Sequence, residues 1–162
     1  MRRTWSEWAP VPIRLVFGFG FAYHGFPKLF SAEQRAGFVG MLEGIGVPAP
    51  GLVAWFVGGL EFVGGLLLIA GAFVVVVAAL GVIEMAVAAV AVHLPNGFNF
   101  INITGMTDAG PEFGMPGYEV NLLYIAGFLA LMLGGAGAAS VDRMRAGAAE
   151  RVPEERTVRA AA

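Results

Sequence analysis

Five ionisable side chains interrupt the long apolar stretches of this chain: Arg14, His24 and Lys28 in the first stretch, and Glu61 and Glu84 further along. A charged group inside a lipid bilayer costs at least ~2.5 kcal/mol on insertion scales, so such groups face the interior of a helix bundle, find partners and mark functional sites. Imidazole and carboxyl groups carry protons, and an ammonium group stabilises anionic charge. These residues are therefore the first candidates for chemistry.

The composition indicates that these groups lie in a membrane protein. The chain has 162 residues, of which 14% are charged and 57% hydrophobic, and its mean hydropathy is +0.73. Soluble domains carry about 25% charged residues, so this chain has too little polar surface to be one. The absence of cysteine excludes disulfides, thiolate zinc sites, Cys-ligated iron–sulfur clusters and dithiol relays. A net charge of −2 without a basic stripe argues against nucleic acid as a partner.

The positions of the charges predict four spans. Residues 120–140 contain no charged side chain, and about 20 apolar residues cross the ~30 Å hydrocarbon core. Residues 51–94 contain only Glu61 and Glu84 as charges, and a single helix over that length would reach roughly 66 Å, so two spans with a turn near 71–73 are expected. The prediction is an all-α, integral membrane four-helix bundle (domain 1–143, with spans about 11–30, 51–71, 73–94 and 120–140) and a flexible cytoplasmic tail over 144–162.

The basic residues predict the orientation of this bundle. Eight of the ten lie near the two ends: Arg2, Arg3, Arg14, Arg143, Arg145, Arg151, Arg156 and Arg159. By the positive-inside rule both termini face the cytoplasm, which requires an even number of spans. The chain also has 24 glycines, many of them inside the spans, and small residues let helix backbones approach closely in lipid. A compact bundle is expected.

Glu61 and Glu84 are predicted to lie at matched depth on adjacent helices. Each is about 15 Å from the outer boundary, near the midplane. If the two carboxylates face each other in a low dielectric, one or both will be protonated near neutral pH. Two interpretations remain open: a proton or quinol site, or a neutral carboxylic acid that donates a hydrogen bond between helices.

The first span is predicted to carry a polar stripe formed by Arg14, Gly18, His24 and Lys28. His24 lies about 9 Å inside the outer boundary, Lys28 follows it at i+4, and Arg14 lies within about 40° of Lys28 around the helix. The structural alternative is that Lys28 and Arg14 extend to the headgroups at opposite boundaries. His24 would then be the one polar residue of this span whose place inside the bilayer needs an explanation.

His93 ends the third predicted span and Glu119 opens the fourth, both at the outer boundary. With His24 and Lys28 they are expected to converge on one outward-facing pocket, covered by the long loop over residues 95–118. Loops of that length often serve as lids or binding loops.

Two histidines and seven methionines suggest soft-metal binding as an alternative. The methionines do not cluster with His24 or His93 in the sequence, however, so packing within the bundle explains them better. No metal site is assigned, and no cofactor is evident apart from a possible quinone.

Residues 14–29 (RLVFGFGFAYHGFPKL) resemble the first-helix signature of the DoxX family: an Arg, a Gly, an aromatic residue, then His-Gly and Lys-Leu. The resemblance continues through residues 58–65 (GGLEFVGG), the helix over 85–93, the loop before Glu119, and Ser140-Val141-Asp142. It covers about residues 10–143.

The resemblance implies a four-helix, multi-pass protein of the bacterial inner (cytoplasmic) membrane, in a group with redox associations. Relatives include subunits linked to thiosulfate:quinone oxidoreduction, and others assemble with superoxide dismutase and a sulfurtransferase, while similar eukaryotic proteins are assembly chaperones. The family's polar positions are matched here by Arg14, His24, Lys28, Glu61 and His93.

The leading functional hypothesis is the membrane subunit of a redox system, which binds a quinone or a small sulfur-containing reductant. In it His24 and Glu61 are the catalytic residues: His24 hydrogen-bonds a quinone oxygen and Glu61 relays protons. The binding residues are Arg14, Lys28, Glu84, His93 and Glu119. Besides the lipid bilayer, a soluble or membrane-bound redox protein is the expected partner. The alternative is a non-enzymatic scaffold or assembly factor that recruits a partner protein. Four spans without broken helices or inverted repeats disfavour a transporter.

Overall fold

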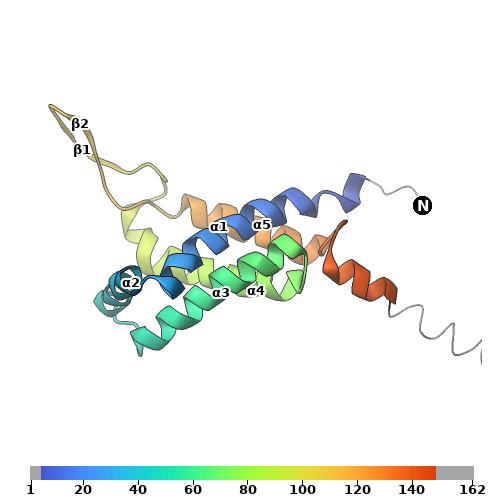
Figure 1. Cartoon of the computed structure of the whole chain (residues 1–162). Helices are drawn as coiled ribbons and strands as arrows, with labels where there is room; N and C mark the ends of the chain where they lie inside the picture. Colours follow the sequence, from blue (N-terminus) through green and yellow to red (C-terminus); the bar gives the residue numbers. More distant parts are fainter. Residues whose placement is uncertain (1–4, 149–162) are drawn as a thin grey trace, which may run out of the picture.

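The computed structural model describes residues 5–148 (Figure 1). Its long helices are α1 (Pro10–Phe30), α3 (Pro50–Ala70), α4 (Val74–Ala88) and α5 (Glu119–Gly134). The shorter elements are a 3-10 turn (Trp5–Glu7), α2 (Ala32–Gly44), a π-helical turn (Ala89–His93), a second 3-10 turn (Leu94–Asn96), and the strands β1 (Ile103–Thr107) and β2 (Gly110–Phe113). The four long helices lie side by side, with α3 packed on α1 and α5 packed on α4.

Two helices are long and apolar enough to cross a membrane. They are α3, over Pro50–Ala70, and α4 with its two short extensions, over Val74–Asn96. α5 is a shorter apolar helix of 16 residues. α1 has 21 residues, and three of them are the basic residues Arg14, His24 and Lys28. Within residues 5–148 the structure is mostly helical, and α3 and the extended α4 are its membrane-capable helices.

A β-hairpin corrects the expected all-α class. β1 and β2 pair antiparallel, and the pair Thr107 and Gly110 closes a tight turn in which Gly110 takes a φ of 122°. Such a positive φ is readily accessible only to glycine. The hairpin forms within the polar connection over residues 95–118, where no apolar helix continues, and it projects beyond the end of the bundle (Figure 1).

Two connections also differ from the expected spans. The first contains α2, which begins after Ser31, whose hydroxyl accepts a hydrogen bond from the Gln34 amide (3.3 Å). The second difference is at α5, which ends at Gly134 because Gly135 adopts a φ of 68°. The helix is thus shorter than the expected span over 120–140. The last six residues of that span, 135–140, form a non-helical segment that we name the strap.

The chain becomes helical again over residues 141–148, directly after the strap. The first five residues of the predicted tail, 144–148, belong to that helix. The rest of the predicted tail, 149–162, lies outside the described residues.

α1 and α3 pack through glycines spaced seven residues apart on each helix: Gly18 and Gly25 on α1, Gly58 and Gly65 on α3. A Cβ atom added at Gly65 would lie 2.5 Å from the backbone nitrogen of Ala22 and 2.5 Å from the carbonyl oxygen of Gly18. The two backbones therefore touch, as small residues allow when helices associate in lipid.

The other helix contacts use glycine differently, because an aromatic ring fills the space. A Cβ at Gly81 of α4 would meet the ring of Phe128 at 2.5 Å. Phe128 is fully buried, and it packs with Phe21, Leu68 and Val77 in the apolar core of the bundle. Edge-to-face contacts with Phe17 and Phe21 fix its ring.

We expect Gly65→Ala to lower the unfolding temperature of the detergent-solubilised protein markedly, because the new methyl group would collide with rigid backbone atoms of α1. Gly59→Ala is the matched control. Gly59 lies on the same helix with open space around it, so alanine there should be neutral or stabilising by up to ~1 kcal/mol through helix propensity. Thermal unfolding followed by circular dichroism measures both. Equal effects of the two substitutions would contradict the close α1–α3 packing.

Candidate functional site

An ion pair between Lys28 in the last turn of α1 and Glu61 of α3 lies in the α1–α3 interface. Lys28 Nζ donates to Glu61 Oε1 at 2.6 Å and also contacts Oε2. The side chains are only 18% and 8% exposed. A buried charge without its partner is costly, so each of these groups requires the other.

Glycine makes this pair possible in a reciprocal way. Gly25 of α1 lies against the Cβ of Glu61, at 2.8 Å from an added Cβ, and Gly58 of α3 lies against the Cβ of Lys28 at 3.0 Å. Each charged residue thus packs over the glycine of the opposite helix. The pairing of Lys28 with Glu61 was not predicted, but the sequence carries a signal for it, since the same Gly-x-x-charge spacing occurs on both helices, Gly25 to Lys28 and Gly58 to Glu61.

Glu84 of α4 is the third member of the site. Its carboxyl group lies within electrostatic reach of the Glu61 carboxyl group and of the Lys28 ammonium group. Glu84 Oε2 is buried and has no hydrogen-bond partner among the described residues. We name Lys28, Glu61 and Glu84 the polar centre. The formal charge of the polar centre is −1 when both carboxyl groups are ionised and zero when one of them carries a proton.

α5 adds two polar side chains near this centre. Tyr124 lies within electrostatic reach of Glu61, and its hydroxyl group contacts Gly20 of α1. Asn121 is 6% exposed and donates to the sulfur of Met85 at 3.8 Å. All four long helices therefore contribute polar groups to the same part of the interior.

α2 covers the polar centre at one end of the bundle. The ring of Phe38 lies 4.6 Å from Lys28 Nζ, a cation–π contact. Arg35 holds α2 in place, because its Nη1 donates to the carbonyl oxygen of Leu29 (3.0 Å) at the end of α1 and its guanidinium stacks over Trp55 of α3 (4.3 Å). This cover could not be predicted from the sequence, because residues 31–50 have no strong apolar periodicity.

His24 lies outside the polar centre, which corrects the predicted stripe on α1. The buried side of α1 is formed by Arg14, Gly18, Phe21 and Gly25. His24 precedes Gly25 by one residue and is rotated from it by about 100°, so its side chain is exposed and contacts the ring of Tyr23. Sequence spacing alone could not separate this flank from the buried face.

His93 and Glu119 lie at the same end of the bundle as α2, but each binds the loop that follows α4. His93 Nδ1 is 2.9 Å from the carbonyl oxygen of Pro116, and Glu119 Oε2 accepts a hydrogen bond from the Phe100 amide at 2.9 Å. Lys28 is turned to Glu61 instead. The structure thus does not bring His24, Lys28, His93 and Glu119 into one pocket.

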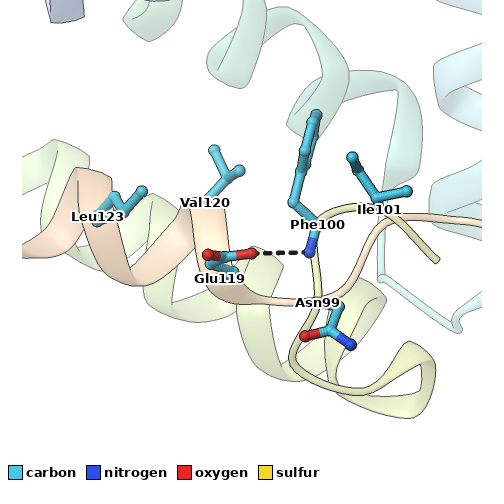
Figure 2. Close-up of a pocket in the computed structure, with 6 residues that line it drawn as sticks. All are labelled: Asn99, Phe100, Ile101, Glu119, Val120 and Leu123. Atoms are coloured by element: carbon cyan, nitrogen blue, oxygen red, sulfur yellow. Dashed lines mark hydrogen bonds between the residues drawn. The ribbon is translucent and has the colours of Figure 1, made fainter.

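Glu119 does line a shallow hollow of about 390 Å³ between this loop and α5. Figure 2 shows the side chains of Phe100, Ile101, Val120 and Leu123 pointing to the same side of it. The hollow is mostly apolar, and of the residues predicted as binding groups only Glu119 lines it.

Arg14 lies at the opposite end of the bundle, where it holds the strap. It is 1% exposed, and its Nη2 donates to the carbonyl oxygens of Ala138 (3.4 Å) and Ala139 (3.1 Å). Its Nη1 contacts Gly71 at the turn between α3 and α4. Arg14 is therefore placed as a structural residue, remote from the polar centre.

Asp142 completes this end of the bundle. Its carboxylate accepts hydrogen bonds from the amides of Phe73 (2.8 Å) and Val74 (3.0 Å), and its own amide donates to the Gly71 carbonyl (3.0 Å). It thereby caps the N-terminus of α4 from 68 residues away. Nearby Arg143 donates to Glu7 (3.1 Å), which raises the pKa of its guanidinium.

Within residues 5–148, no three side chains of the His, Asp and Glu types lie together as a metal-binding group. The polar centre is an ion cluster of one ammonium group and two carboxyl groups, and Glu84 Oε2, which has no partner among the described residues, is a free hydrogen-bonding position in it.

Comparison with models of protein families gives a match to DoxX over residues 9–94, more than half of the chain. The chain belongs to the DoxX family. The matched part of this DoxX protein spans α1 to α4 and contains the whole polar centre, together with Arg14, His24 and His93. The hairpin, Glu119 and α5 of the DoxX protein lie beyond the match. No curated protein and no solved structure matches the chain.

We expect Lys28→Met and Glu61→Leu each to destabilise the DoxX protein by roughly 3–5 kcal/mol, because each leaves one buried charge unpaired. The combined variant should recover most of that loss. Arg143→Gln is the control: its ion pair is at the surface, with side chains 48% and 32% exposed, and should contribute less than about 1 kcal/mol. Unfolding in mixed micelles measures all four proteins. Additive losses in the combined variant would contradict a direct Lys28–Glu61 pair.

Asp142→Ala should lower stability by about 1–2 kcal/mol, since it removes the acceptor for the two amides at the start of α4 and a carboxylate that acts on Arg14 by charge. Hydrogen exchange of the first turn of α4 should rise with it. Asp108→Ala, in the hairpin turn, is a control that should leave exchange at α4 unchanged. Unaltered protection of Phe73 and Val74 in the Asp142 variant would refute the cap.

Proposed function

We propose that this DoxX protein crosses the cytoplasmic membrane four times, with both termini in the cytoplasm. Membership of the family supports a membrane protein, and α3 and α4 have the length and apolarity to cross. α1 and α5 pack alongside them with the directions of successive helices alternating. The end with Arg14, Arg143 and Arg145 then faces the cytoplasm, and α2 and the hairpin face outward.

Within that frame the protein serves as the membrane subunit of a redox system, and its polar centre handles the protons of a quinone. Reduction of a quinone to a quinol takes two electrons and two protons. The chain has no cysteine, so the electrons come from a small sulfur-containing reductant or from a partner protein. The observation that carries the proposal is the buried ion pair with a second carboxyl group, Glu84, whose Oε2 has no partner in the described part of the chain.

Each residue has a distinct task in this proposal. Glu61 and Glu84 exchange a proton with the quinone oxygen, and Lys28 stabilises the anionic charge that develops there. His24 lies on the exposed flank of α1, one turn before Lys28, where a ring arriving from the lipid meets its imidazole first. Arg14, His93 and Glu119 act at the ends of the bundle and hold its connections in place.

The direct test is the quinone content of the protein purified from its native membrane, with rebinding of decylubiquinone in nanodiscs. We expect close to one quinone per chain in the unmodified protein. The combined Lys28→Met and Glu61→Leu variant, whose fold should survive, is expected to bind none.

Glu112→Gln is the matched control, because it removes a carboxylate from the exposed hairpin and should keep the quinone. If the unmodified protein neither contains nor rebinds quinone, the redox proposal fails. The non-enzymatic scaffold then becomes the better account, with the polar centre fixing the packing alone.

A further inference from the structure

The β1–β2 hairpin has one apolar and one polar face. Ile103 pairs with Phe113 and Met106 with Pro111, and alternation along β2 places Phe113 and Pro111 on the same face. Gly105 pairs with Glu112 on the opposite face. We name Ile103, Met106, Pro111 and Phe113 the hairpin face.

The hairpin face is uncovered in the described structure. Ile103 is 55% exposed, Phe113 67% and Met106 75%. The bundle cannot shield it, because the hairpin projects past the ends of the helices (Figure 1). Exposed apolar patches of this kind mark interaction surfaces.

The charge around this face is acidic. Residues 95–119 contain Asp108, Glu112 and Glu119 but no lysine or arginine. Asp108 lies in the hairpin turn and Glu112 on the opposite face. A second copy of the chain would bring two acidic hairpins together, and an anionic membrane surface would repel them.

We propose that the hairpin face docks a protein on the side of the membrane to which the hairpin projects, and that this partner presents an apolar pocket rimmed by lysine or arginine. The inference stands apart from quinone binding, since the polar centre takes no part in it. Ile103, Met106 and Phe113 would enter the pocket, while Asp108 at the hairpin turn meets its basic rim. Apolar anchors supply the affinity of such an interface, and the charges speed association.

The first experiment places a benzophenone amino acid at Met106 or Phe113 in living cells, with Glu112 as the polar-face control position. Irradiation should join the first two positions to one and the same protein, and the control position to far less of it. A crosslink to a second copy of the chain, or to no protein, would overturn the proposal.

The second experiment uses the crosslinked protein in purified form against the full chain in nanodiscs. Binding should weaken with added salt and fall at least tenfold in Phe113→Asp, but stay unchanged in Ile45→Asp, an exposed apolar residue at the same end of the bundle. Equal binding by Phe113→Asp would overturn the proposal, whatever protein was captured.

A third measurement separates docking from insertion into lipid. The Phe113→Trp variant, in a background that lacks Trp5, Trp8 and Trp55, should show the fluorescence emission of a tryptophan in water when it is in nanodiscs of phosphatidylethanolamine and phosphatidylglycerol. Its emission should shift to the blue only when the purified partner is added. A blue shift in nanodiscs alone would assign the hairpin face to the membrane surface and refute a protein partner.

Discussion

The contact of the α1 and α3 backbones constrains everything else in this molecule. Side chains larger than hydrogen at Gly25 or Gly65 would separate the helices, and Lys28 would then lose Glu61. In lipid that loss leaves two isolated charges, each costing several kcal/mol. The glycines and the ion pair are thus one device: close approach makes the pair possible, and the pair fixes the register of the two helices.

The two ends of the bundle stabilise the α1–α3 contact and its ion pair in different ways. At one end α2 lies over it, with Phe38 on Lys28 and Arg35 across the end of α1. At the other end, Arg14 donates a hydrogen bond to the strap and contacts Gly71 in the turn between α3 and α4. Asp142 accepts hydrogen bonds at the start of α4. α4 carries Glu84, so the capping of that helix also sets where the second carboxyl group lies. Among the described elements, only the hairpin projects away from these contacts.

Position along the helices was readable from the sequence, but direction around a helix was not. Counting residues from the charge-free segments brought Glu61 and Glu84 to matched depth, and the structure has them interacting. His24 and Lys28 share an i, i+4 spacing, yet only Lys28 turns inward, because the partner helix and its glycines select the buried face. The hairpin and α2 depend on contacts with the ends of the bundle, which apolar periodicity does not encode.

The most direct test of this account is the distance between Lys28 Nζ and the Glu61 carboxyl carbon in lipid bilayers, measured by solid-state NMR on specifically labelled protein. The account predicts strong dipolar coupling, as for an ion pair in contact, together with exclusion of both side chains from bulk water. If the labelled protein is folded and no coupling between Lys28 and Glu61 is seen, or if water has free access to both side chains, a buried polar centre at the α1–α3 interface would be contradicted.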